Sequence, residues 1–261
     1  MTTTGQQSQT VPGSPPRGGI GFAVGAALER IASALPGLLL VTARDPGMGT
    51  AFADAFPTRC LSAPGTRSRL AVAAGAALTG RPVVVFCEDP ADAASGPWPV
   101  HPPLVAITSS LDVATTAWGG GVAVVMPTWP ADVEPLLWAA LEGGPACVHL
   151  HDQPVAEASP LALTLPRLDE MRVLTEGPHA RVAAAGSLVA PLLDAAWRLA
   201  REGIHVTTLQ FPALPGEGLG PRQATGHVLL QRDAASAMEW VPAPTHEAGE
   251  VAETLAARIR P

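Results

Sequence analysis

Short, continuously apolar runs alternate along this chain with longer segments of helical periodicity. The first pair is typical: apolar residues recur at helical spacing over 21–35, Pro36 and Gly37 end the helix, and the run 38–42 follows as a strand. Strands that are apolar on both faces belong to parallel sheets that helices cover on both sides. The sequence therefore predicts an α/β fold with mainly parallel sheets.

The same alternation predicts the remaining elements. A turn is expected at 45–49, and a loop at 108–121. A short helix is expected between that turn and Ala55, and further helices are expected at 68–78, 132–141, 188–202 and 247–259. Strands are expected at 59–61, 83–87, 104–108, 122–126, 146–150, 181–185, 205–210 and 227–231.

A segment that contains several prolines and has no clear periodicity divides the chain into two consecutive α/β domains. With 261 residues and 47% hydrophobic content, the chain is long enough for two cores. Residues 1–18 are polar and rich in Pro and Gly, which predicts a disordered N-terminal tail. The first domain is expected at 19–151, a proline-containing linker at 152–169 and the second domain at 170–261.

Charge, hydropathy and cysteine content indicate which classes of partner and location are not expected. The net charge is −7 and no cluster of basic residues follows a phosphate backbone, so nucleic acid is not an expected partner. No apolar run has membrane-spanning length, and the first residues lack the apolar stretch of a signal peptide. Cys60, Cys87 and Cys147 form no paired motif and are interpreted as buried thiols of a cytoplasmic protein.

Two patterns have both a functional and a structural interpretation. His149 and His151 would point to one side of a strand and could bind a metal, but no third ligand is spaced to match. We therefore interpret them as surface residues at a strand end, and no metal ligand is assigned. Ser187 follows Gly186 outside any nucleophile motif, so we interpret it as the cap of the next helix.

Glycines and tryptophans in predicted loops also allow either a functional or a structural interpretation. The segments 47–49 and 119–121 could cradle a phosphate, although loop geometry explains both. Trp98, Trp118 and Trp129 fall in predicted loops near the carboxyl edge of the sheet, where they either line an interface or are partly buried.

Three separated blocks carry a resemblance to one family. The first is FPTRCLSAPGTR at 56–67, which continues into GAALTGRPV at 75–83; the second spans 124–145; the third spans 173–177 and 185–204. In this order they resemble the pyrimidine-binding and C-terminal domains of transketolase-like thiamine diphosphate enzymes. The pattern is most similar to beta subunits of 2-oxoacid dehydrogenase components of the pyruvate dehydrogenase type. The resemblance implies a pyrimidine-binding-like domain followed by a transketolase C-terminal-like domain.

The resemblance also implies where a cofactor's pyrimidine ring would lie. Arg67 occupies the position of the family's activating glutamate, or Thr66 does when the count runs backwards from Ala74. A guanidinium stays protonated at physiological pH and cannot exchange that proton, so no catalytic residue is predicted. Phe86 and Glu88 stand where aromatic residues cover the ring in the family. Glu88 is either a displaced acid or a solvated turn carboxylate.

No G-D-G segment for binding a diphosphate occurs in this chain. The resemblance therefore implies thiamine diphosphate with magnesium only where a diphosphate-binding alpha-type subunit completes the site, in a homodimer or heterotetramer. The segment 108–121 also lacks the family's active-site histidine.

These features define three functional hypotheses. The first is a beta-type subunit of a two-component thiamine diphosphate-dependent 2-oxoacid dehydrogenase or transketolase-like enzyme, with a degenerate cofactor-activating site. The alternative is a non-catalytic interaction or assembly protein of the same fold. The third is a binder of an anionic ligand at Arg67, where Arg67 and Arg69 would bind an acidic substrate or a phosphate. A salt bridge from these residues to a partner subunit is equally consistent.

Overall fold

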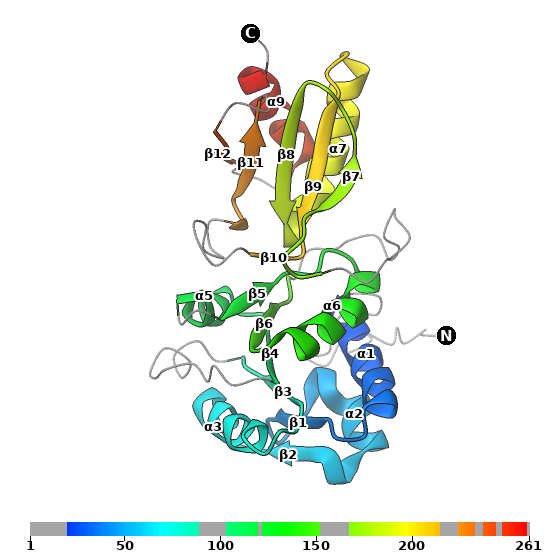
Figure 1. Cartoon of the computed structure of the whole chain (residues 1–261), viewed down its shortest axis with the longest axis vertical. Helices are drawn as coiled ribbons and strands as arrows, with labels where there is room; N and C mark the ends of the chain where they lie inside the picture. The colour runs from blue at the N-terminus through cyan, green and yellow to red at the C-terminus, as the bar shows by residue number, and fades with distance from the viewer. Residues whose placement is uncertain are drawn as a thin grey trace, which may run out of the picture.

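A computed structural model describes residues 20–88, 103–119, 122–151, 167–214, 224–232, 237–243 and 247–259. Over these residues the chain forms two sheets that follow one another along the long axis of the molecule, each with its own helices (Figure 1). The predicted α/β class is confirmed. The predicted tail and most of the predicted linker lie outside the described residues.

The first sheet is almost entirely parallel. Its strands are ordered β10-β5-β6-β4-β3-β1-β2, and β10 is antiparallel to β5 while all other pairs are parallel. A short strand from late in the chain therefore closes one edge of a sheet built from the first half. The strands are β1 (Leu39–Thr42), β2 (Cys60–Ser62), β3 (Val83–Phe86), β4 (Leu104–Thr108), β5 (Ala123–Val125), β6 (Ala146–His149) and β10 (Ala213–Leu214).

Helices cover both faces of this sheet (Figure 1). Residues Leu40, Val84 and Phe86 pack on one side, and their neighbours Leu39 and Val85 pack on the other. This alternation follows from the pleat of a strand, and it explains why the strands are apolar throughout. The first face carries α1 (Ile20–Ala34), α2 (Thr50–Ala55) and α6 (Pro130–Gly143), and the second carries α3 (Thr66–Ala77) and α5 (Leu111–Gly119).

The prediction of a loop at 108–121 is wrong, because α5 occupies most of that segment. The Ser110 hydroxyl accepts a hydrogen bond from the amide of Val113 at 3.4 Å, which starts the helix in the manner of an N-cap. Val113, Ala114 and Ala117 are buried against the sheet at helical spacing. A short apolar segment after a strand thus forms the crossover to β5.

The second sheet has mixed pairing, in contrast to the prediction of mainly parallel sheets for both domains. Its order is β12-β11-β8-β9-β7, where β8 and β9 are parallel and the other pairs are antiparallel. Among these strands, β8 and β9 are parallel because a crossover helix joins them. The sequence analysis did not predict the antiparallel strands β7 and β12. The elements are β7 (Arg172–Thr175), β8 (Ala180–Ala185), α7 (Val189–Arg201), β9 (Val206–Phe211), β11 (His227–Gln231), β12 (Glu239–Pro242) and α9 (Ala248–Ile259).

One face of the second sheet is covered by α7 and α9. The chain enters α7 through a 3₁₀ turn, Gly186–Leu188, and no side chain caps the helix. The prediction that Ser187 is the cap is therefore wrong: it lies buried inside the turn.

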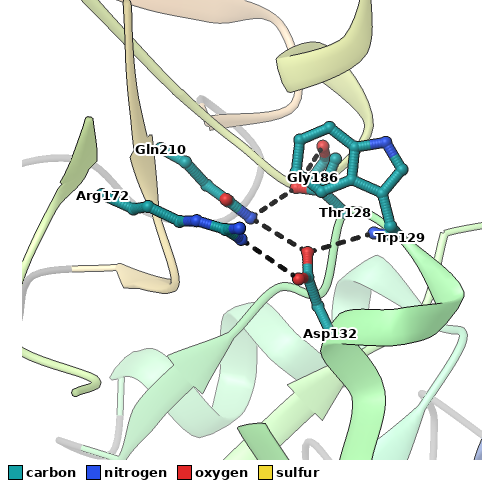
Figure 2. Close-up of polar contacts among 6 residues, drawn as sticks. All are labelled: Thr128, Trp129, Asp132, Arg172, Gly186 and Gln210. Carbon is teal, nitrogen blue, oxygen red and sulfur yellow. Dashed lines mark hydrogen bonds and ion pairs between the residues drawn. The ribbon is translucent and has the colours of Figure 1, made fainter. Parts of the chain in front are cut away.

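A buried polar network joins the two sheets (Figure 2). Asp132, at the start of α6, pairs with Arg172 of β7 at 3.3 Å and accepts a hydrogen bond from Gln210 of β9 at 3.4 Å. Gln210 also donates to Thr128 at 2.9 Å, and the Thr128 hydroxyl donates to the carbonyl of Gly186 at 3.2 Å. The network thus fixes the first turn of α6 against two strands of the second sheet.

Arg59, in the 3₁₀ turn Pro57–Arg59, ties the start of β2 to the end of α1. Its Nη1 lies 2.9 Å from the carbonyl oxygen of Ala32, 3.4 Å from that of Leu35 and 3.1 Å from that of Pro36. The guanidinium also lies 3.8 Å from the ring centroid of Phe56. The arginine of the FPTR motif thus satisfies carbonyls that a helix leaves unpaired at its C-terminus.

Arg59→Met should lower the free energy of unfolding by about 1–3 kcal/mol, because the apolar stem stays while the hydrogen bonds and the cation–π contact are lost. Urea denaturation measures this change. Arg81→Met is the matched control, since Arg81 is exposed and donates one bond, to Gly37 at 3.2 Å. Equal effects of the two substitutions would contradict the capping role.

The buried carboxyl Asp132 should make stability depend on pH. Burial is the main cause that raises the pKa of Asp132 above its ordinary value of 3.8, against hydrogen bonds from Gln210 and the charge of Arg172. The folded state then binds this proton more tightly than the unfolded state. The contribution of Asp132 to stability is therefore largest below pH 3.8 and falls as pH rises through the raised pKa.

Asp132→Asn removes this titration. We expect the free energy of unfolding of the wild type to fall relative to that of the variant as pH rises from about 4 to about 7. Chemical denaturation of both proteins across this range tests the prediction. A relative gain of the wild type with rising pH would show that the pKa is lowered instead.

Candidate functional site

The strand order of the first sheet has a switch point at its carboxyl edge. From β1 the chain passes through α2 to β2, and from there α3 carries it back across β1 to β3, which continues toward β4. The connections that leave β1 and β3 therefore run in opposite directions. In α/β sheets such a switch point is where ligands bind. The first turn of α3 lies at this edge because α3 follows the carboxyl end of β2.

The inward stripe of α3 begins with polar residues. Thr66, Arg69, Leu70, Ala73 and Ala77 recur at helical spacing and are buried toward the sheet. Leu70, Ala73 and Ala77 pack in the apolar core. Thr66 and Arg69 place a hydroxyl and a guanidinium beside that core, in the first turn of α3.

The start of α3 has an uncapped backbone. Gly65, the N-cap residue, adopts φ 64° and ψ 150°, a conformation that favours glycine, and no side chain caps the helix. The first amide of α3 that bonds back to the chain in helical register is that of Arg69, which donates to the carbonyl of Gly65 at 3.1 Å. The amides before it point out of the helix end.

Arg69 is a buried cation with few partners. Arg69 is only 4% exposed, and its Nη2 donates a hydrogen bond to the Thr66 hydroxyl at 3.2 Å. Its buried Nε has no hydrogen-bond partner, and no carboxylate forms a salt bridge with it in the described part of the chain. The guanidinium is thus folded back toward the helix start without a counter-charge among these residues.

Of the four residues predicted to contact a cofactor, the structure places Thr66 alone on the inward face of α3. Thr66 points inward beside Arg69, but Arg67 and Glu88 are exposed. Phe86 is buried on the opposite face of the sheet, where it packs so close to Gly49 that an added Cβ there would lie 2.9 Å from its ring. The turn at 47–49 is therefore a packing feature, as its structural interpretation proposed.

Arg69 is the candidate site residue that the motif alignment does not select, since the alignment gives it only as a second cation beside Arg67. Counting back from Ala77 and Ala73 at helical spacing leads to Leu70, Arg69 and Thr66. The phase of the helix, rather than the motif alignment, identifies the inward arginine.

Cys87, just after β3, faces α3 from the sheet. Burial raises the pKa of its thiol to about 12, while the positive charge of Arg69 acts to lower it and Glu88 acts to raise it. The thiol therefore stays protonated, so it is not a nucleophile of this site.

These side chains do not fit an activated aminopyrimidine. Activation requires an acid that shares a proton with a ring nitrogen, and the inward positions here carry the hydroxyl of Thr66 and the fixed charge of Arg69. A ring that gains a proton becomes cationic, and a nearby guanidinium would oppose that charge.

Other candidate residues have structural surroundings. Over the residues that the structure describes, no three His, Cys, Asp or Glu side chains cluster as metal ligands. His149, expected at the surface, is buried because β6 lies between two strands of the sheet, and His151 is partly exposed. Trp129 is buried in the core under the second sheet rather than lining an interface, Trp118 lies in α5, and Trp98 lies outside the described residues.

Comparison with known proteins gives similarity in structure only. No family model matches the sequence, and no curated protein is significantly similar to it. Among solved structures, a split-gene transketolase described as an inactive beta4 tetramer is 21% identical, with a TM-score of 0.65, and the match covers 75% of this chain and 72% of that one.

Two transketolase structures from Pichia stipitis are also similar. A mutant enzyme in complex with xylulose-5-phosphate is 14% identical with a TM-score of 0.60, and a complex with sedoheptulose-7-phosphate is 13% identical with a TM-score of 0.61. Both matches cover 92% of this chain but only 45% of the enzyme, so the chain spans less than half of those proteins. The fold is therefore transketolase-like. In the described part of the molecule, no helix has the length and apolarity needed to cross a membrane.

The three thiols should differ in reactivity. Cys60 is partly exposed, although burial raises its pKa somewhat, whereas Cys87 and Cys147 are fully buried and burial strongly raises the pKa of both. A disulfide reagent at mildly alkaline pH should modify Cys60 in the folded protein and reach the other two only after unfolding. The Cys60→Ser variant should show no fast phase. Fast reaction of that variant would mean that the site opens to solvent.

Proposed function

We propose that this chain is a beta-type subunit of a two-component, transketolase-like assembly, and that it contributes structure to the assembly without activating a cofactor itself. The observation that carries the proposal is the inward face of α3, where the described residues provide a fixed cation in place of an acid. Support for a partner comes from the similarity to a split-gene transketolase that is described as a beta4 tetramer. The proposed partner is an alpha-type chain that binds the diphosphate and magnesium.

The outward face of α3 supports assembly. Val72 is 39% exposed and Leu78 is 68% exposed, and the residues between them on this face are small, including Ala74 and Gly75. A helix with apolar residues on every side is normally covered on every side. The neighbouring edge strand β2 adds an exposed apolar residue, Leu61. We propose that a second subunit covers this surface in a homodimer or heterotetramer.

The substrate class is the finer part of the proposal. Similarity to a split-gene transketolase favours a transketolase-like role, while the sequence pattern favours a 2-oxoacid dehydrogenase beta subunit of the pyruvate dehydrogenase type. A cytoplasmic location belongs to the same proposal and is supported by the free thiols of all three cysteines.

A second candidate is a non-catalytic assembly protein that binds no cofactor in any complex. The specific observation in its favour is the position of Arg69, whose charge opposes a protonated aminopyrimidine. Both candidates require a partner, but only the first requires thiamine diphosphate to bind in the complex.

Calorimetric titration of thiamine diphosphate with magnesium separates them. The titration is made into the isolated chain and into its mixture with a chain that carries a G-D-G diphosphate-binding segment and is encoded beside it. Binding in the mixture alone supports the beta-type subunit. A complex that binds no cofactor supports the assembly protein, and the absence of any oligomer or complex overturns both.

Val72→Asp tests the proposed interface. Placing a charge on the outer face of α3 should weaken assembly at least about tenfold, as measured by sedimentation, while leaving the circular dichroism spectrum unchanged. Trp197→Asp is the control, because Trp197 is 69% exposed on α7, away from α3. Equal loss in both variants would argue against an interface on α3.

A further inference from the structure

Arg69 poses an electrostatic problem that the proposed assembly does not solve. It is 4% exposed, it is positively charged at all accessible pH values, and its Nε donor lacks a partner among the described residues. A buried charge is strongly unfavourable unless an opposite charge and hydrogen bonds compensate for it.

The described groups around the guanidinium supply little compensation. The Thr66 hydroxyl accepts one hydrogen bond at 3.2 Å and carries no charge. Glu88 lies near enough to affect the pKa of Cys87, as Arg69 does, but it is exposed and forms no salt bridge with Arg69. The carboxylate of Glu88 is therefore directed to solvent rather than to the cation.

The helix end adds a second group of donors at the same place. The hydrogen bond to Thr66, the first residue of α3, holds the guanidinium back along the helix toward its N-terminus. There the amides of Arg67 and Ser68 precede the first helical hydrogen bond, and no side chain caps them. The positive end of the helix dipole favours a negative group at this position.

We infer that the N-terminus of α3 is an anion site, in which Arg69 and the first-turn amides bind the oxyanion group of a small molecule, a phosphate or a carboxylate. A small ligand is favoured over a carboxylate side chain from a partner because the guanidinium is almost wholly buried, whereas Arg67, two residues earlier on the opposite side of α3, is exposed and available to a partner. The site lies at the switch point between β1 and β3. The inference thereby assigns to this edge of the sheet a ligand class opposite in charge to a protonated aminopyrimidine.

Inorganic phosphate tests the site on the isolated full-length chain, so the outcome does not depend on whether a partner exists. At a phosphate concentration about ten times the dissociation constant, the melting temperature should rise by about 3–6 °C relative to sodium chloride at equal ionic strength. Acetate in a parallel series distinguishes a carboxylate site from a phosphate site by its relative effect.

Substitutions of two arginines on opposite sides of α3 provide the matched control. Arg69→Gln should weaken phosphate binding about 10- to 100-fold in calorimetry, since a charge-assisted hydrogen bond and the buried charge are lost. Arg67→Gln removes the same formal charge from the exposed side of α3 and should leave binding within about twofold of the wild type. Arg69→Lys should retain part of the affinity.

A direct readout avoids relying on Arg69→Gln alone. The Nε–H of Arg69 is buried, so its ¹⁵N–¹H resonance should be protected from exchange in the wild type and should shift on addition of phosphate. The inference is overturned if both anions stabilise the protein no more than chloride does. It is also overturned if Arg67→Gln weakens binding as much as Arg69→Gln, or if the Arg69 resonance stays unchanged while the others shift.

Discussion

A parallel sheet whose strands are apolar on both sides has to be covered by helices on both faces, and most of this molecule follows from that requirement. In the first sheet, Leu39 and Leu40 point in opposite directions, so neither α1 nor α3 can be absent without exposing a core. The coverage sets the phase of α3, because Leu70, Ala73 and Ala77 must face the sheet. Once those three residues are placed, Thr66 and Arg69 are directed inward as well. The buried charge of Arg69 at the start of α3 is thus held in place by the packing of these apolar residues against the sheet.

The second sheet meets the same requirement differently. Helices α7 and α9 cover one face, while Phe211 and Trp240 on the other face pack against the first core. The network of Asp132, Arg172 and Gln210 is a second contact between the sheets, in which buried polar groups are hydrogen-bonded to one another rather than to water. The two sheets therefore share apolar and polar contacts and do not simply succeed one another along the chain.

The sequence could predict whatever depends on local periodicity and could not predict whatever depends on long-range pairing. The strand at 38–42 and the helix at 188–202 correspond to β1 and α7 because their apolar patterns are decided within the segment. The mixed pairing of the second sheet escaped prediction because β7 and β12 are short and partly exposed, which leaves them little apolar signal. For the candidate site, motif alignment pointed to the α3 segment but selected the outward Arg67 rather than the inward Arg69. Phe86 lies on the opposite face of the sheet, because successive side chains of a strand alternate between faces and a motif does not fix that phase.

The first sheet cannot be completed until the two-residue strand β10, which comes late in the chain, has been synthesised. Its pairing with Val124 and Val125 closes the edge of β5, yet Ala213 and Leu214 leave the ribosome long after β5 itself. Until then, β5 presents unpaired backbone groups that can template pairing with another chain. The first half of this protein is therefore exposed to misassembly during translation, and a gene cut between the two sheets would leave that edge permanently open.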